Sequence, residues 1–290
     1  MFSSKNNRTK NLGGYDTAVM KARVSEIDGT LSGEMELPIV FDTPVREDII
    51  HKSYVNLLSH NFQKQGRYPM AGEVVSAESR NTGQGIARIA RARGEGFPRA
   101  GQAAGVAGVR HGRVAHPPES WKKTYKKINK KENKYGLCSS IAATSNKELV
   151  ERRGHKLGKI GGLPIIASND IESIAKAKDL KNALVNLGIG EDLQRVENSK
   201  SSSGTRRRRG RKSRSGKSVL IVVDENKKVL DLSGSLRGVD IKSVKDISVL
   251  DTAPGSRPAR LTIFSLGAIE KLKLLKLALH YKREVGSSNE

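Results

Sequence analysis

The sequence predicts an α/β protein whose mainly parallel sheet and flanking helices are interrupted by a long, extended, basic loop. Three observations support this prediction. After residue 139, short apolar runs alternate with helical patterns, which is typical of parallel sheets. The run 219–223 is short and wholly apolar, as expected for a strand buried on both faces. Residues 62–116 show no period of 2 or 3.6, so they predict neither strand nor helix.

Composition and charge restrict the function classes. The 290 residues carry 53 Lys and Arg against 30 Asp and Glu, a formal net charge of +23. This charge favours a polyanionic partner, nucleic acid ahead of an anionic membrane surface. Only 36% of residues are hydrophobic, below the ~45–50% of ordinary globular chains, so part of the chain is expected to pack no core. One cysteine excludes an internal disulfide, and the lack of a spanning run or an apolar N-terminal stretch predicts an intracellular protein.

Before residue 62 the chain reads as the first part of a small α/β unit. The ranges 18–24 and 37–41 are short and lean toward strand. Pro44 precedes the range 46–65, whose apolar residues recur at helical spacing. We therefore expect two strands and one helix in this region.

From residue 139 onward the pattern predicts alternating helices and strands. Asp170 is the expected N-cap of the helix that follows the first of these strands. Cys138 lies among small and apolar residues and is expected in the core. The expected helices are 139–143, 146–153, 178–187 and a last one with the apolar face Ile269, Leu272, Leu275 and Leu279; the expected strands are 163–167, 219–223, 239–244 and 261–264.

Residues 62–116 are the most unusual segment. They hold ten Gly, ten Ala, eight Arg and one Lys against three acidic residues. Structureless segments of this length are functional or disordered, and Arg between small residues suits close contact with a phosphate backbone. Folded RNA is the expected partner, because it is recognised through shape and unpaired bases. The alternative is a disordered tail that binds single strands loosely, but the segment is internal and not repetitive.

Two further segments are strongly basic. Residues 119–135 hold seven Lys against two Glu, and their apolar residues Trp121, Tyr125, Ile128 and Tyr135 lie at helical spacing. We expect a helix whose repelling charges are neutralised by an outside anion, with a solvated surface helix as the alternative. Residues 200–217 hold nine basic residues and no acid, so this segment is expected to be extended and solvent-facing unless it is neutralised.

No motif indicates catalysis, a metal or a cofactor, and none is expected. Gly216-Lys217-Ser218 lacks the spacing of a phosphate loop, because five residues rather than four separate Gly210 from Gly216. None of the six His pairs with Cys or carboxylates at ligand spacing. An RNA-modifying or RNA-cleaving enzyme and a chromatin-type DNA-binding protein stay open as alternatives to a structural RNA-binding protein.

Several short motifs along the chain are weak one by one and specific in combination. They are Gly66-Arg67-Tyr-Pro69, Ser76-Ala77-Glu78-Ser79, Thr82-Gly83-Gln-Gly85-Ile-Ala87-Arg88, Gly112-Arg113-Val-Ala115-His116-Pro117-Pro118, Ser139-Ser140-Ile141-Ala142-Ala143-Thr144, Arg209-Gly210-Arg211-Lys212 and Ala253-Pro254-Gly255. Together they resemble the family of the fourth large-subunit ribosomal protein, in its archaeal/eukaryotic-type form, over about residues 15–285.

The resemblance implies a structural protein of the large ribosomal subunit, cytoplasmic and without catalysis of its own. Its implied partners are large-subunit RNA and neighbouring large-subunit proteins, with transient contact to the nascent peptide and with no membrane and no small-molecule substrate. The family pattern assigns 1–61 and 119–290 to an α/β globular domain. It assigns 62–118 to a loop that penetrates the RNA and helps line the peptide exit tunnel.

The resemblance and the charge pattern together imply two sets of site residues. The tip of the loop, near residues 86–99, would face the tunnel with Ile86, Arg88, Ile89, Arg91, Arg93 and Glu95. The RNA-binding set is Arg67, Arg80, Arg88, Arg91, Arg93, Arg99, Arg110, His111, Arg113, His116, Lys122, Lys123, Lys126, Lys127, Lys130, Arg206, Arg207, Arg208, Arg209, Arg211, Lys212 and Arg214.

The chain departs from the family pattern at this tip. Relatives often carry a proline between the hydrophobic residue and the arginine, where this chain has Ala90 between Ile89 and Arg91. Glu95 places a negative charge where RNA would repel it, so it is expected to pair with a neighbouring Arg or to face the tunnel. No long C-terminal extension follows the last helix, which favours an archaeal-type protein.

Overall fold

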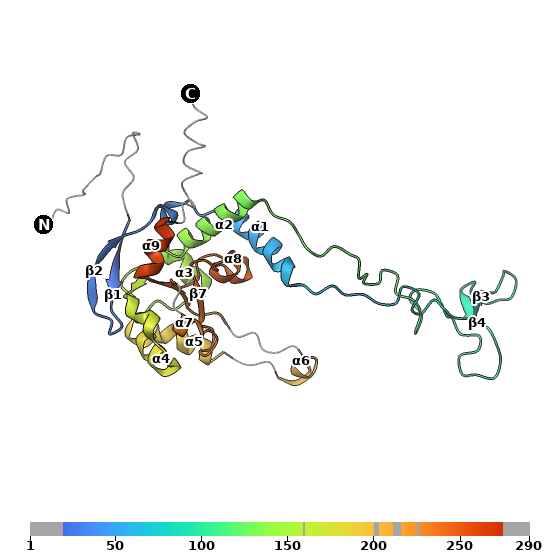
Figure 1. Cartoon of the computed structure of the whole chain (residues 1–290). Coiled ribbons are helices and arrows are strands. Elements are labelled where there is room, and N and C mark those ends of the chain that lie inside the picture. Colours follow the sequence, from blue (N-terminus) through green and yellow to red (C-terminus); the bar gives the residue numbers. More distant parts are fainter. Residues whose placement is uncertain (1–19, 159, 200–202, 211–215, 225–226, 275–290) are drawn as a thin grey trace, which may run out of the picture. The chain divides into compact units, whose positions relative to one another are not determined.

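The chain divides into two compact units (Figure 1). The first comprises Met1–Leu58 and Lys127–Glu290, and the second comprises Ser59–Lys126. No helix in the described residues is long and apolar enough to cross a membrane. The structure, a computed structural model, describes residues 20–274 except 159, 200–202, 211–215 and 225–226.

A six-stranded sheet forms the centre of the first unit, with the strand order β2-β1-β5-β8-β6-β7. β1 and β2 pair antiparallel, and all other neighbours pair parallel. The expected mainly parallel sheet is therefore confirmed. The strands are β1 Lys21–Ser25, β2 Leu31–Glu36, β5 Ile165–Ala167, β6 Leu220–Val223, β7 Asp240–Ser243 and β8 Thr262–Ser265.

The central strands are buried on both faces because their sequences are apolar without alternation. In β6, Ile221 and Val223 belong to one hydrophobic cluster, whereas Leu220 and Val222 belong to the other. Successive side chains of a strand point to opposite faces, so an apolar layer forms on each side of the sheet. On the face that carries Leu220 and Val222, the ring of Phe264 packs edge-on against that of Phe41, with ring centroids 5.5 Å apart.

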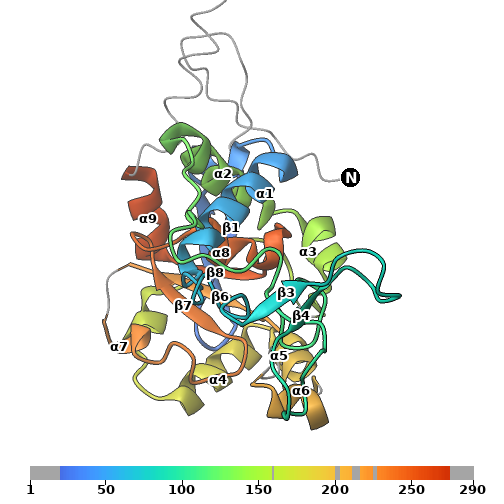
Figure 2. The same ribbon diagram turned by 90° about the vertical axis from the view of Figure 1, so that its right-hand side faces the viewer.

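Helices cover both apolar layers (Figure 2). One hydrophobic cluster includes residues of α3, α4 and α5, and the other includes residues of α2 and α9. In Figure 2, α2 and α9 lie above the strands, and α4 and α5 lie below them. The helices are α1 Glu47–Leu58, α2 Lys130–Ala143, α3 Lys147–Arg153, α4 Ala177–Asn186, α5 Gly190–Glu197, α6 Gly204–Arg208, α7 Lys227–Leu230, α8 Val249–Thr252 and α9 Leu266–Leu274.

The short helix α3 illustrates how local sequence signals fix an element. The side chain of Asn146 accepts hydrogen bonds from the N–H groups of Glu148, at 3.0 Å, and Leu149, at 3.4 Å. These bonds satisfy donors that the first turn of a helix leaves free. Gly154 ends the helix at φ 100°, a left-handed conformation that glycine adopts without strain. Val150 anchors the helix in the core.

Most expectations for the region after residue 139 are confirmed. The strands β5 to β8 and the helices α3 and α4 form where the pattern predicts them, and Cys138 is buried. In the first part of the chain, β1 is confirmed, and α1 forms but ends at Leu58. α9 includes Ile269 and Leu272, whereas Leu275 and Leu279 lie outside the described residues.

The expected strand at 37–41 is wrong. This stretch is the 3₁₀ turn η1 Ile39–Asp42, in which the N–H of Phe41 donates to the carbonyl of Pro38 at 3.0 Å. Pro38 has no N–H to give to a strand ladder, which favours the turn. The second strand of the hairpin, β2, lies just before it, and its side chains are almost all exposed. Because β2 lacks a buried face, no apolar alternation marked it in the sequence.

Two further corrections concern helix starts. The helix expected over 119–135 begins only at Lys130, so residues 119–129 are not helical. Repulsion among the lysines of 119–129 opposes helix formation. Asp170 caps no α-helix, because it lies inside the 3₁₀ segment η3 Asn169–Ser173 and α4 begins at Ala177. The sequence analysis also missed α5, which follows α4 after a very short turn and has no side-chain cap.

Candidate RNA interface

The second unit begins and ends with two chain segments that run side by side. The ring of His60 stacks on the ring of Tyr125, with centroids 4.1 Å apart and planes 9° from parallel. His60 Nε2 also lies 3.1 Å from the carbonyl of Lys126, whose N–H donates to Ser59 Oγ at 3.0 Å. Gly66 lies so close to Ser120 that a Cβ on the glycine would come within 2.9 Å of it. These contacts pair the two ends of the unit.

Further along, two glycines bring the paired segments into direct backbone contact. A Cβ on Gly72 would lie 2.6 Å from the carbonyl oxygen of Gly112, closer than real Cβ contacts come. Gly72 also has φ +80°, a conformation that other residues adopt only with strain. A larger residue at this position would therefore force the segments apart.

A small sheet lies in the middle of the unit. β3 Ala77–Ser79 pairs antiparallel with β4 Ala90–Ala92. On its other edge, β4 exchanges hydrogen bonds with residues 102–104: the N–H of Ala92 donates to Gln102 at 2.9 Å, and the N–H of Ala104 donates to Ala90 at 2.9 Å. The chain thus forms two loops, 80–89 and 93–101, on either side of β4. Ile86 and Arg88 of the expected tip lie in the first loop and Glu95 lies in the second.

The unit has a defined backbone path but no hydrophobic core. Among residues 59–126 only the small polar Ser59 is buried. The unit also carries twelve Lys and Arg against four Glu, a net charge of +8. The large apolar side chains it leaves exposed are Phe62, Tyr68, Met70, Val74, Val75, Ile86, Phe97, Val114, Trp121 and Tyr125.

Three of the expected RNA-binding arginines bond to the unit itself. Arg67 donates to the carbonyl of Ala71 at 2.8 Å, and Arg91 donates to the carbonyl of Gly101 at 2.9 Å. Arg93 forms an ion pair with Glu78. Arg91 and Arg93 thus hold the chain around β3 and β4 in place, whereas Arg67 bonds locally before β3.

The other expected arginines of this unit are exposed. In the part of the chain that the structure describes, their guanidinium groups form no hydrogen bond or ion pair. An unpaired guanidinium offers a planar fork of donors that matches a phosphate group. This second group consists of Arg80, Arg88, Arg99, Arg110 and Arg113.

The expected histidines and lysines also lie on the surface. His111 has φ 60°, which places it in a tight turn. Residues 119–129, without a helix, present Trp121 and Tyr125 between lysines, with exposed fractions of 64% and 58%. Bases stack on such rings. The spacing of Trp121 and Tyr125 indicated one face of a helix, and neither residue is in the expected RNA-binding set. The exposed basic residues here are His111, His116, Lys122, Lys123, Lys126, Lys127 and Lys130.

Glu95 and Ala90 show how the tip differs from the family pattern. Glu95 is exposed, and its carboxylate forms no ion pair among the described residues; the acid that pairs with an arginine is Glu78. Ala90 lies in β4 opposite Ser79. Of the two alternatives for Glu95, pairing with a neighbouring Arg does not occur among the described residues, and facing the tunnel stays a prediction.

The basic segment 200–217 belongs to the first unit. Its described middle is the short helix α6, where Arg206, Arg207, Arg208 and Arg209 are all exposed and without a side-chain partner in the described chain. The exposure of these residues agrees with the expectation of a solvent-facing segment, whereas the expected extended form is wrong for 204–208, which are helical. Arg211, Lys212 and Arg214 lie outside the described residues.

Both ends of this basic segment are fixed to the globular unit. Before it, the guanidinium of Arg237 donates to the carbonyl and the hydroxyl of Ser199, at 3.2 and 3.0 Å. At the last residue of the segment, the ammonium of Lys217 pairs with Asp240 at 2.7 Å. The backbone carbonyl of Lys217 accepts a hydrogen bond from Arg195 at 2.9 Å.

Arg195, which bonds to Lys217, also bonds to a buried carboxylate, that of Asp192. Asp192 accepts hydrogen bonds from Ser218 Oγ at 2.6 Å and from Arg195 Nε at 2.9 Å, and it contacts His155 Nδ1 at 3.2 Å. Burial alone would raise the pKa of Asp192, but the hydrogen bonds from His155, Arg195 and Ser218 hold it well below its usual value. Burial in turn lowers the pKa of His155, against the opposing effect of Asp192.

Comparison with known proteins relates the chain to one family. A family model described as "Ribosomal protein L4/L1 family" matches residues 35–274. A protein of Pyrobaculum aerophilum named large ribosomal subunit protein uL4 is 40% identical over 259 residues, covering 89% of this chain and 90% of the relative. The uL4 proteins of Methanococcus vannielii and Methanococcus aeolicus are each 38% identical, over 88% and 87% of this chain and 99% and 98% of their own lengths.

Proposed function

This chain belongs to the ribosomal protein L4/L1 family, and from that premise we propose that residues 62–118 penetrate the RNA of the large subunit and help line the peptide exit tunnel. The chain is an archaeal-type, structural and non-enzymatic constituent of the large ribosomal subunit, and ribosomal RNA and neighbouring ribosomal proteins are its partners. The enzyme hypothesis is therefore set aside, and no finding favours the chromatin-type one.

One observation carries the proposal: a unit of defined backbone without a core. Residues 59–126 bury almost nothing of their own and carry a net charge of +8. Such a unit gains its burial and its counter-charge from a surrounding polyanion, and it completes its ordering on binding. Ribosomal RNA supplies both phosphate groups and unpaired bases.

The side chains suggest a division of labour within the loop. Arg67, Arg91 and Arg93 act mainly as positioning residues, because their guanidinium groups already bond to the unit. The arginines without a partner, together with the lysines of 119–130, neutralise phosphates. Trp121 and Tyr125 offer stacking surfaces for bases.

A pair of deletions tests this proposal. Removing 68–113 takes away seven Arg and three Glu, and removing 204–210 takes away four Arg, so each deletion removes a net charge of +4. Because residues 68–113 contribute nothing to either sheet-facing cluster, we expect both variants to keep the circular dichroism and Tm of the full chain. Unfolding of the 68–113 deletion would contradict the division into domain and loop.

Sedimentation on sucrose gradients at low and high salt supplies the functional readout. We expect the full chain and the 204–210 deletion to stay with the large subunit after a high-salt wash. The 68–113 deletion should leave the subunit, since the deeply placed contacts are gone. If the 68–113 deletion resists the wash as well as the full chain does, the loop is not what holds the protein in the RNA.

A further inference from the structure

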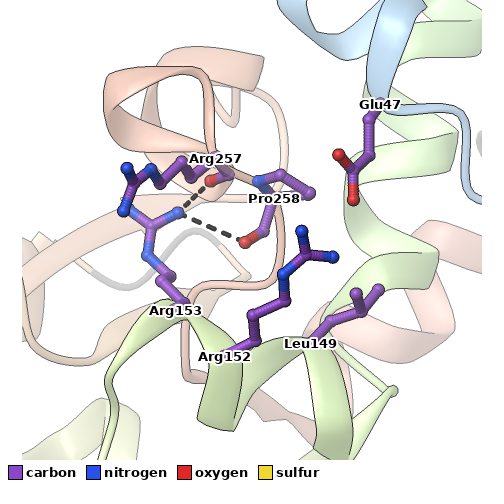
Figure 3. Close-up of a pocket in the computed structure, with 6 residues that line it drawn as sticks. All are labelled: Glu47, Leu149, Arg152, Arg153, Arg257 and Pro258. Atoms are coloured by element: carbon purple, nitrogen blue, oxygen red, sulfur yellow. Dashed lines mark hydrogen bonds between the residues drawn. The ribbon is translucent and has the colours of Figure 1, made fainter.

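A hollow of about 300 Å³ opens on the first unit (Figure 3). Its residues come from the start of α1, the end of α3 and the loop after the 3₁₀ turn η4 Pro254–Ser256. None of them is among the site residues that the sequence indicated. The lining residues are Glu47, Leu149, Arg152, Arg153, Arg257 and Pro258.

One wall of this hollow is the strained loop 254–259, which the side chain of Arg153 holds in place. Arg153 donates to the carbonyls of Pro254, at 2.7 Å, and Pro258, at 3.3 Å, and also to that of Arg257. Ser256 and Ala259 have φ 68° and 65°, in the left-handed region that side chains disfavour. Such conformations persist only where surrounding contacts enforce them, and they cluster at ligand clamps. The loop therefore presents Arg257 and Pro258 from a fixed backbone.

Three charged groups around the hollow are left available. The carboxylate of Glu47 and the guanidinium groups of Arg152 and Arg257 form no hydrogen bond or ion pair within the described residues. By contrast, the neighbouring acid Asp48 pairs with Arg46 at 2.6 Å. Arg153 is fully engaged with the loop carbonyls, so it shapes the hollow and offers little to a ligand.

The mixture of groups selects the chemistry of a ligand. The guanidinium fork of Arg257 fits a phosphate, whereas Glu47, on the other side of the hollow (Figure 3), would repel one. A carboxylate accepts two parallel hydrogen bonds, and the Watson–Crick edge of guanine offers two adjacent donors, an imino N–H and an amino group. Adenine offers a single amino group on that edge. Leu149 and Pro258 add apolar surface for the plane of a base.

We propose that this hollow binds one unpaired guanosine nucleotide of the large-subunit RNA, with its phosphate on Arg257 and its base edge on Glu47. The proposal rests on the chain's function as a ribosomal RNA-binding protein. It gives the globular unit a contact that reads a base, in addition to the charge neutralisation of the loop. Unpaired bases are where proteins read RNA sequence.

Equilibrium dialysis with the full chain at high salt tests the proposal, using GMP, AMP and inorganic phosphate as probes. We expect GMP to bind more tightly than AMP or phosphate. Arg257→Ala should weaken GMP binding by about tenfold or more, since it removes a charge-assisted hydrogen bond. Glu47→Gln should reduce GMP binding to the level of AMP. The matched controls Arg23→Ala and Glu34→Gln, exposed on β1 and β2, should bind GMP as the unchanged protein does.

Several outcomes overturn the proposal. Equal binding of GMP and AMP by the unchanged protein would exclude base reading. This measurement needs no variant, so it does not depend on how a variant folds. Full GMP preference in Glu47→Gln would exclude the role of that carboxylate. Variant-sensitive uptake of GMP by intact large subunits would assign the hollow to a free nucleotide, because a hollow filled by RNA takes up none. Binding of ribosomal RNA by the same preparations tests the proposed function separately.

Discussion

Arginine side chains of equal charge do different work in this protein, depending on what their guanidinium groups already contact. In the second unit, Arg67 and Arg91 donate to carbonyls of their own loops, whereas Arg99 and Arg113 are exposed without a side-chain partner in the described chain. Sequence places all four in one basic, glycine-rich segment. Only the backbone path separates arginines that shape the loop from those free to meet phosphate.

Arg113 provides a test at this scale. Arg113→Ala should weaken binding to large-subunit RNA and reduce the slope of log K against log salt by about 1, the loss of one neutralised phosphate. Arg113→Lys should keep the slope, because it keeps the charge, while losing the planar fork. Filter binding over a range of salt concentrations measures both. An unchanged slope in Arg113→Ala would remove Arg113 from the RNA-contacting set.

At the scale of helices and strands, apolar periodicity competes with repulsion between like charges. The aromatic spacing of 119–135 indicates a helix, yet the structure has one only from Lys130. Repulsion among neighbouring lysines, of which residues 119–135 hold seven against two Glu, outweighs the apolar periodicity. Where a cap, an apolar face and a terminal glycine agree, as in α3, the sequence pattern and the structure coincide.

The cap of α3 can be tested directly. Asn146→Ala should lower the free energy of unfolding by about 1 kcal/mol, because the N–H groups of Glu148 and Leu149 lose their acceptor. Asn146→Gly should cost only a few tenths of a kcal/mol, since glycine suits the cap backbone. Urea denaturation of the full chain measures both changes. A loss in the glycine variant as large as in the alanine variant would mean that the side-chain bonds are not the cause.

At the scale of the whole molecule, one buried carboxylate ties together segments that are distant in sequence. Asp192 in α5 bonds to His155, which follows α3, and to Ser218, which precedes β6. Removing one member of such a buried network leaves the others unsatisfied. The same network includes Arg195, which also donates to the carbonyl of Lys217 at the end of the basic segment.

This network predicts a loss of stability in acid. Burial lowers the pKa of His155 in the folded chain, so the unfolded chain takes up a proton first and stability falls as the pH drops below about 6.5. The lowered pKa of Asp192 adds a second loss at much lower pH, below its ordinary range. Tm measured between about pH 7.5 and 5.5 should show the first decline. His155→Gln should flatten it, whereas His51→Gln, with an exposed ring, should not. An equal slope in His155→Gln would locate the effect elsewhere.

The candidate interface was only partly predictable from the sequence. The glycine- and arginine-rich segment and the basic block near 206–214 are visible as composition, because a solvated charged segment needs no tertiary partner to be recognised. The His60–Tyr125 stack and the bonds of Arg91 and Arg93 join residues brought together only by the backbone path. The hollow at Arg152 combines three elements separated by about a hundred residues each, so no local pattern marks it.

The sequence by itself determined the α/β class, the core strands and the position of the basic loop, because apolar runs, helical periods and net charge act locally or additively. It also carried the motifs that identify the family. Tertiary structure alone decided which arginines stay free, where β2 joins the sheet edge, and how Arg153 and the strained loop at Ser256 enclose a hollow. These features depend on contacts between distant residues, whose geometry is set only when the whole chain packs.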